Sequence, residues 1–276
     1  MKTVILSALL SGMTMMSFAQ TDTTAPAKSD TIRIGGMIII KKAGKDGGES
    51  KDIVISHHQR TRLTNISTNW FIFDLGFANY KDETNYAAAQ QSGFVTAGIN
   101  GKDNLKLRTG KSVNVNIWFF MQKLNISKHV LNLKYGLGLE LNNYHFDDER
   151  VHFTKNPTTV GLDPAWANVD KNKLAADYVT IPLMLNFNFT PGRNRGMGFS
   201  AGISAGYLYS ARQKVKIDGD KDKLHDDFNL EKFKLSYIAE VSLGPVKLYG
   251  SMSIKNMWEK GLDQVPYNVG LRFSHF

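Results

Sequence analysis

The stretch that decides the fold is Leu131-Asn-Leu-Lys-Tyr-Gly-Leu-Gly-Leu-Glu-Leu-Asn142. Every second residue from Leu131 to Leu141 is apolar or aromatic, and the residues between them are Asn, Lys, Gly and Glu. Successive side chains of a β-strand point to opposite faces, so this alternation predicts a strand with one apolar face and one polar face.

The same period of two recurs in the rest of the chain after Trp70. Apolar faces span residues 71–77, 113–121, 179–189, 199–209, 235–243, 246–254 and 267–273, with Met121 closing the second of these segments. No charged residue lies on these faces, whereas the opposite faces carry Asn, Ser, Gly and several charges. With the opening stretch, this predicts eight antiparallel strands, either in a soluble sandwich that buries its apolar face or in a membrane barrel that turns it to lipid.

The connections between these segments favour the membrane barrel. They are long after the first, third, fifth and seventh segments (78–112, 144–177, 210–234 and 255–266). They are short after the second, fourth and sixth (124–129, 190–196 and 244–245). Outer-membrane barrels alternate in this way, with long loops outside and tight turns in the periplasm.

Aromatic residues on the apolar faces fall at two levels of such a barrel. Phe77, Tyr207, Tyr209, Tyr237 and Tyr267 come at the long-loop rim, and Phe71, Phe187, Phe189, Phe199 and Phe273 come at the short-turn rim. Two aromatic girdles are typical of outer-membrane barrels. We therefore predict an all-β fold, a transmembrane antiparallel up-and-down β-barrel of about eight strands over residues 69–276.

The residues before the barrel predict export. Lys2, the apolar run to Met16 and Ser17-Phe18-Ala19 form a signal-peptide pattern over residues 1–19. Residues 20–68 are expected to be a periplasmic lead-in, in which the runs Thr31–Ile40 and Asp52–Ser56 form a small hairpin or else add a pair of strands to the barrel. The chain has no Cys, so disulfides cannot stabilise it.

The polar faces predict a filled lumen. An eight-stranded barrel is wide enough only for its own side chains. We expect the carboxylates of Asp74, Glu140 and Glu240 to pair there with Lys134, Lys247 and Arg272, because buried charges need partners. The bulky Trp118, Phe120 and Tyr249 are assigned to the same face.

Several stretches resemble one family. Tyr178-Val-Thr-Ile-Pro-Leu-Met-Leu-Asn-Phe187 and Lys111-Ser-Val-Asn-Val-Asn116 are similar to strands of the Bacteroidota outer-membrane barrels that include PorT-like proteins with an OmpA-like barrel domain. Asp30-Thr-Ile-Arg-Ile-Gly35 resembles the N-terminal lead-in of the same proteins. The resemblance implies an outer-membrane barrel and supplies no catalytic residues. Phe273 and Phe276 resemble the C-terminal insertion signal of such barrels, although Phe276 is out of phase with Phe273.

Motifs that suggest enzymes or metal sites fit their surroundings poorly. Gly198-Phe-Ser-Ala-Gly202 matches a nucleophile elbow, but the alternation runs straight through it, where an elbow needs a strand, a turn and a helix. Asp218-Gly-Asp-Lys-Asp222 begins like a calcium loop and then lacks the required Gly and Glu. A lipid-acting site would have to come from a rim cluster of four residues: His145, Asp147, Asp148 and His152.

The sequence thus predicts a structural or partner-docking protein of the outer membrane, with no catalysis, no cofactor and no metal. Its N-terminus is expected in the periplasm and its four long loops outside the cell. The expected partners are outer-membrane lipid, the barrel-assembly machinery and an envelope protein, but no nucleic acid, even though the net charge is +9. A lipid-modifying enzyme, a narrow channel and an accessory of protein secretion are the alternatives.

Overall fold

The structure is a computed structural model, and the chain divides into two compact units, residues 1–60 and 61–276. The residues described are 30–34, 37–41, 54–57, 63–96, 98–166, 169–193, 196–217, 219–244 and 246–274. The first unit contains β1 (Asp30–Ile34), β2 (Met37–Lys41) and β3 (Val54–His57). These strands form an antiparallel sheet of their own, in the order β1-β2-β3.

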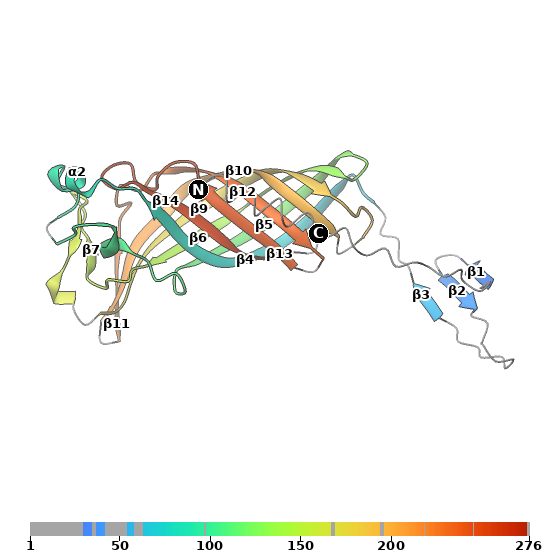
Figure 1. Cartoon of the computed structure of the whole chain (residues 1–276), viewed down its shortest axis with the longest axis horizontal. Helices are drawn as coiled ribbons and strands as arrows, with labels where there is room; N and C mark the ends of the chain where they lie inside the picture. The colour runs from blue at the N-terminus through green and yellow to red at the C-terminus, as the bar shows by residue number, and fades with distance from the viewer. Residues whose placement is uncertain are drawn as a thin grey trace, which may run out of the picture. The chain divides into compact units, whose positions relative to one another are not determined.

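The second unit is a closed barrel (Figure 1). In the part of the chain that the structure describes, eight strands form the ring: β4 (Ile66–Asp82), β5 (Val113–Ser127), β6 (Leu131–His145), β9 (Val169–Asn188), β10 (Met197–Ile217), β12 (Phe233–Leu243), β13 (Val246–Ser253) and β14 (Gln264–Phe273). Each pairs antiparallel with the next, and β14 pairs with β4 to close the ring. The predicted all-β up-and-down barrel is confirmed.

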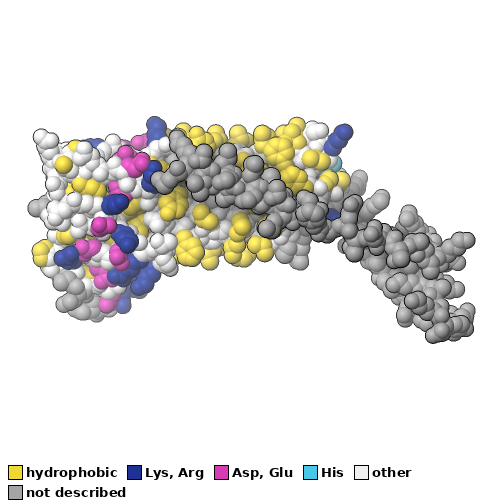
Figure 2. Space-filling view, viewed as in Figure 1, with side chains coloured by type: hydrophobic (Ala, Val, Ile, Leu, Met, Phe, Trp, Pro, Cys, Tyr) yellow, Lys and Arg dark blue, Asp and Glu magenta, His cyan; other side chains and the backbone are white. Residues whose placement is uncertain are grey.

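The outer wall of the barrel is apolar. Val269 and Ile181, which the alternation places on this wall, are 58% and 55% exposed. Figure 2 shows a broad apolar surface over the middle of the barrel, with charged side chains concentrated at the end where β11 lies. Exposed apolar surface on this scale is stable when it faces hydrocarbon and unfavourable in water.

Among the described residues, no helix combines the length and the apolar character needed to cross a bilayer.

A β-bulge changes two of the predicted side-chain directions. Trp118 pairs with Gly138 and Phe120 with Leu137, so Phe119 is an extra residue in β5. The bulge exchanges the faces of the residues that follow it. Met121 is therefore fully buried in the lumen. Phe120 packs against the exposed side chain of Trp70, with ring centroids 6.0 Å apart. The predicted faces of both residues were therefore wrong.

The long connections fold together as a cap at one end of the barrel. They contain α2 (Tyr86–Gln91), β7 (Val151–Phe153), β8 (Val160–Leu162), β11 (Asp220–His225) and the 3₁₀ turns η2 (Lys102–Leu105) and η3 (Pro164–Trp166). Asn85 caps α2 by accepting from the Ala88 N–H at 3.1 Å. The cap has an apolar core that continues into the ends of the barrel strands, a feature that the sequence did not predict.

Candidate functional site in the barrel lumen

Arg272 of β14 is the centre of the charged side chains in the lumen. Its Nε and Nη2 donate to the two carboxylate oxygens of Asp74 on β4, both at 2.7 Å, and its Nη1 donates to Glu240 on β12. The guanidinium carbon lies 5.4 Å from the ring centroid of Trp118 and 5.8 Å from that of Tyr249. A bidentate pair stacked on aromatic rings is a strong and geometrically specific arrangement.

Lys134 of β6 extends the network across the barrel. Its ammonium donates to both oxygens of Glu240, at 2.7 and 2.6 Å, and both side chains are almost fully buried. Asp74 also accepts from Asn116 at 3.1 Å and from the Trp118 indole at 2.7 Å. Charges buried this deeply are tolerated because their remaining hydrogen-bonding positions are filled.

Glu140 has a partner that the sequence analysis missed. It accepts from Lys234 of β12, and also from Asn142 at 3.1 Å and Asn268 at 3.2 Å. Lys234 lies two residues before Ser236 and therefore on the same polar face. Extending the period of two by one step would have found it.

The remaining predicted residues lie near the short-turn end of the barrel. Lys247 of β13 is buried and donates to the backbone carbonyl of Ser274 at 3.2 Å. Phe273 is the last residue of β14, opposite Phe73 of β4, and is 59% exposed on the outer wall. Phe276 lies outside the described residues.

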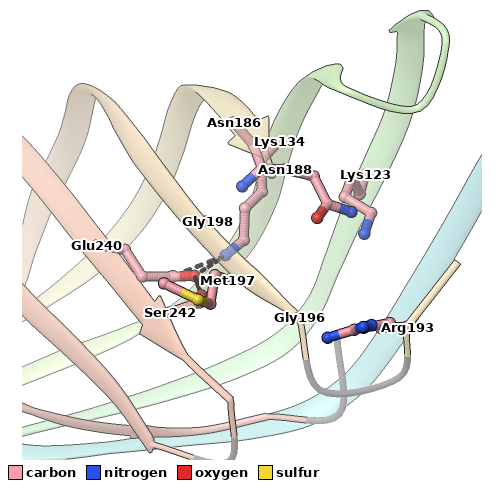
Figure 3. A pocket seen from close by; sticks show the side chains of 10 residues that line it. All are labelled: Lys123, Lys134, Asn186, Asn188, Arg193, Gly196, Met197, Gly198, Glu240 and Ser242. Carbon is pink, nitrogen blue, oxygen red and sulfur yellow. Dashed lines mark hydrogen bonds and ion pairs between the residues drawn. The ribbon is translucent and has the colours of Figure 1, made fainter. Parts of the chain in front are cut away.

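A polar pocket is found at the same end of the lumen. Basic and amide side chains line it together with Glu240: Lys123, Lys134, Arg193, Asn186 and Asn188. Figure 3 shows Lys134 reaching Glu240 across the pocket, with Arg193 on the turn between β9 and β10. Elsewhere in the lumen Ile72, Trp118, Met121 and Met184 form a buried apolar cluster, so the interior is occupied by side chains.

The rim cluster does not converge on one site. Arg108 forms an ion pair with Asp147, with Nε 3.1 Å from Oδ1. Asp148 pairs instead with Arg150, and this hydrogen bond lowers the pKa of the Asp148 carboxyl. His145 is buried, with Nδ1 3.2 Å from the Phe146 carbonyl oxygen, and His152 lies 3.7 Å from Asp163. Each of these four side chains thus has a different neighbour.

The nucleophile-elbow motif lies within a continuous strand. Ser200 is buried in β10, faces the lumen and accepts a hydrogen bond from Asn186 at 3.0 Å. Throughout the described ranges, no group of three or more His, Asp or Glu side chains is arranged to hold a metal ion.

The comparison with protein families agrees with this architecture. The family described as outer membrane protein beta-barrel domain matches residues 74–258, which is more than half of the chain. No curated protein matches the sequence. The solved structure of Ail, the attachment invasion locus protein of Yersinia pestis, is similar over 76% of this chain and 100% of the Ail chain, at 10% identity and a TM-score of 0.33. Through the family match, this chain belongs to the outer-membrane β-barrel proteins.

Proposed function

We propose that this protein is a non-conducting outer-membrane anchor that presents a folded loop platform to a partner protein of the cell envelope. The observation that carries the proposal is the packed cap. Each long connection contributes at least one buried aromatic residue to its core: Phe94 from the first, Phe146 and Phe153 from the second, Phe228 from the third and Trp258 from the fourth. A barrel needs only its strands to stay in the membrane, so ordering all four connections serves something beyond anchoring.

The rings of the cap contact one another directly. Phe153 stacks on Trp258 with centroids 5.6 Å apart and an interplanar angle of 15°. Trp258 also meets Phe94 edge-on at 5.9 Å, and Phe153 lies 5.7 Å from Phe228. Aromatic pairs of this kind stabilise a structure beyond the area they bury, so the cap supplies a fixed surface for recognition.

The filled lumen supports an anchor in preference to a channel. The Arg272 network and the apolar cluster around Trp118 occupy the interior of an eight-stranded barrel. A barrel of this size has room only for its own side chains or a small ligand. Dispersal of the rim cluster among separate partners likewise supports a role without catalysis.

The orientation and origin of the chain are part of the proposal. We infer that residues 1–19 are a signal peptide, that the N-terminus is periplasmic and that the cap is extracellular, because long loops in this family of folds face outward. Insertion would then use the barrel-assembly machinery. The strand motif from Tyr178 to Phe187 supports membership of the Bacteroidota PorT-like group.

Site-specific photocrosslinking in intact cells tests the docking role. A photoreactive amino acid is placed at exposed cap positions (Lys102, Lys155 or Lys260), and exposed positions on two short turns (Lys128 and Arg193) serve as controls. We expect one discrete crosslinked protein from the cap and none from the turns. Crosslinks from the turns alone, or large conductance steps of the purified protein in a planar bilayer, would overturn the proposal.

A further inference from the structure

Strands β9, β10 and β11 continue beyond the barrel as a sheet that carries lysines in register. Across the three strands, Lys171 is opposite Lys216, which is opposite Lys221. In the adjacent row, Lys173 is opposite Lys214, which is opposite Lys223. Directly opposed residues of an antiparallel pair share a face, so the six lysines form one surface, here called the basic face.

The basic face continues the lipid-facing wall of the barrel. Lys171 and Lys173 have the same parity along β9 as Val179 and Ile181, whose side chains are exposed on the outer wall. In β10 a bulge between Leu208 and Ser210 shifts the parity, which turns the even-numbered Lys214 and Lys216 outward. The opposite side of this sheet is buried against the cap through Asn172, Leu174, Gln213 and Val215.

Few carboxylates balance this charge. Asp170 pairs with Lys216 at 3.2 Å, and Asp177 pairs with Arg212, which precedes Lys214 by two residues in β10 and so lies on the same face. Asp220 and Asp222 alternate with the lysines of β11 and so lie on the other side of that strand. Like charges directly opposite one another in a sheet are destabilising, so an arrangement with seven cations and two carboxylates calls for an external anion.

The basic face lies above the apolar wall, on the side of the headgroup layer of a surrounding membrane. Tyr207 and Phe233 lie at the upper edge of that wall, with ring centroids 5.1 Å apart. Tyr207 pairs with Val179 of β9, and Lys173 and Lys171 are six and eight residues from Val179, which at the usual rise and tilt places their backbone about 14–19 Å above that edge. Lysine side chains are long and flexible, so their ammonium groups reach down from this height toward lipid headgroups.

We propose that the basic face binds the phosphate groups of lipid headgroups in the leaflet that surrounds the cap. The lysine stems lie along the wall while their ammonium groups reach the phosphates, and the neutralised lysines then no longer repel one another. The proposal depends on the barrel crossing a membrane and is independent of any docking role of the cap.

The test uses the full-length protein in detergent, with diphosphoryl lipid A as the probe and its dephosphorylated form for comparison. The variant K171Q/K173Q/K214Q/K216Q removes four cations from the basic face. The control K102Q/K155Q/K255Q/K260Q removes four exposed lysines from the cap connections, so both variants have the same net charge. Native mass spectrometry measures bound lipid, and a heat-modifiability gel confirms that every variant is folded.

We expect the basic-face variant to lose at least about tenfold in affinity for diphosphoryl lipid A, since each cation near an anionic lipid surface contributes appreciably. The control and the corresponding Lys→Arg variant should bind like the original protein, and the dephosphorylated lipid should bind weakly to all. Equal losses in both Gln variants, or none in either, would overturn the proposal. The proposal would also fail if the basic-face variant lost heparin binding but kept lipid A binding. The ligand of the basic face would then be a soluble polyanion.

Discussion

Replacing Arg272 by Met tests whether the lumen network holds the barrel together. Methionine has a similar length and no charge, so the change leaves the fully buried Asp74 without its charged partner. Asp74 keeps the Asn116 and Trp118 donors, and Glu240 keeps Lys134. Removing one partner of a buried pair costs about 3–5 kcal/mol, and these surviving donors place the expected loss near the lower value.

A loss of about 3 kcal/mol changes the unfolding equilibrium by roughly a hundredfold. Urea titration in detergent micelles, followed by tryptophan fluorescence, measures the free energy of unfolding. Arg193→Met is the matched control, because Arg193 is exposed on a short turn, and it should change stability little. Adding Asp74→Asn to Arg272→Met should recover part of the lost stability, since the unpaired charge of Asp74 is removed. A loss below about 1 kcal/mol for Arg272→Met, or no recovery in the double variant, would refute the reasoning.

Three further outcomes are expected. Gly138→Val should reduce the heat-resistant fraction on a gel, because a Cβ there would lie 2.7 Å from an indole carbon, whereas Gly110→Val, with open space around it, should not. Trp258→Ala should make the long loops sensitive to protease while the barrel stays heat-modifiable, because its ring belongs to the cap core and not to the barrel wall. Burial lowers the pKa of His152, although the nearby carboxylate of Asp163 opposes this shift. The folded cap therefore binds fewer protons than the unfolded chain, and it loses stability as the pH falls through about 6.5. His152→Asn should reduce this acid sensitivity, measured by proteolysis at a series of pH values from 8 to 5.

Much of the barrel could be predicted because its pattern is local. A strand between lipid and a filled lumen must alternate apolar and polar side chains, so residues 131–142 alone indicate both the strand and its two faces. Strand order followed from the alternation of long and short connections. The prediction was wrong at Met121 and Phe120, where a bulge inserts Phe119 and no local signal marks it.

The lumen partners depended on facts that a period of two does not contain. The sequence could assign Glu140 and Lys234 to polar faces, but their strands lie on different parts of the ring, and only closure with its stagger brings them together. Extending the period of two would have placed Lys234 on the polar face, but not against Glu140. Lys247 meets Ser274 through the pairing of β13 with β14.

The sequence by itself determined the strands, their apolar and polar faces and the outer-membrane class, because these follow from the side-chain period and from the contrast between lipid and lumen. Only the tertiary structure decided which charges meet, that the four long connections share one core, and that six lysines align on one face. These features join residues far apart in the chain. Their contacts are set by strand register and barrel closure, which no local pattern of residues specifies.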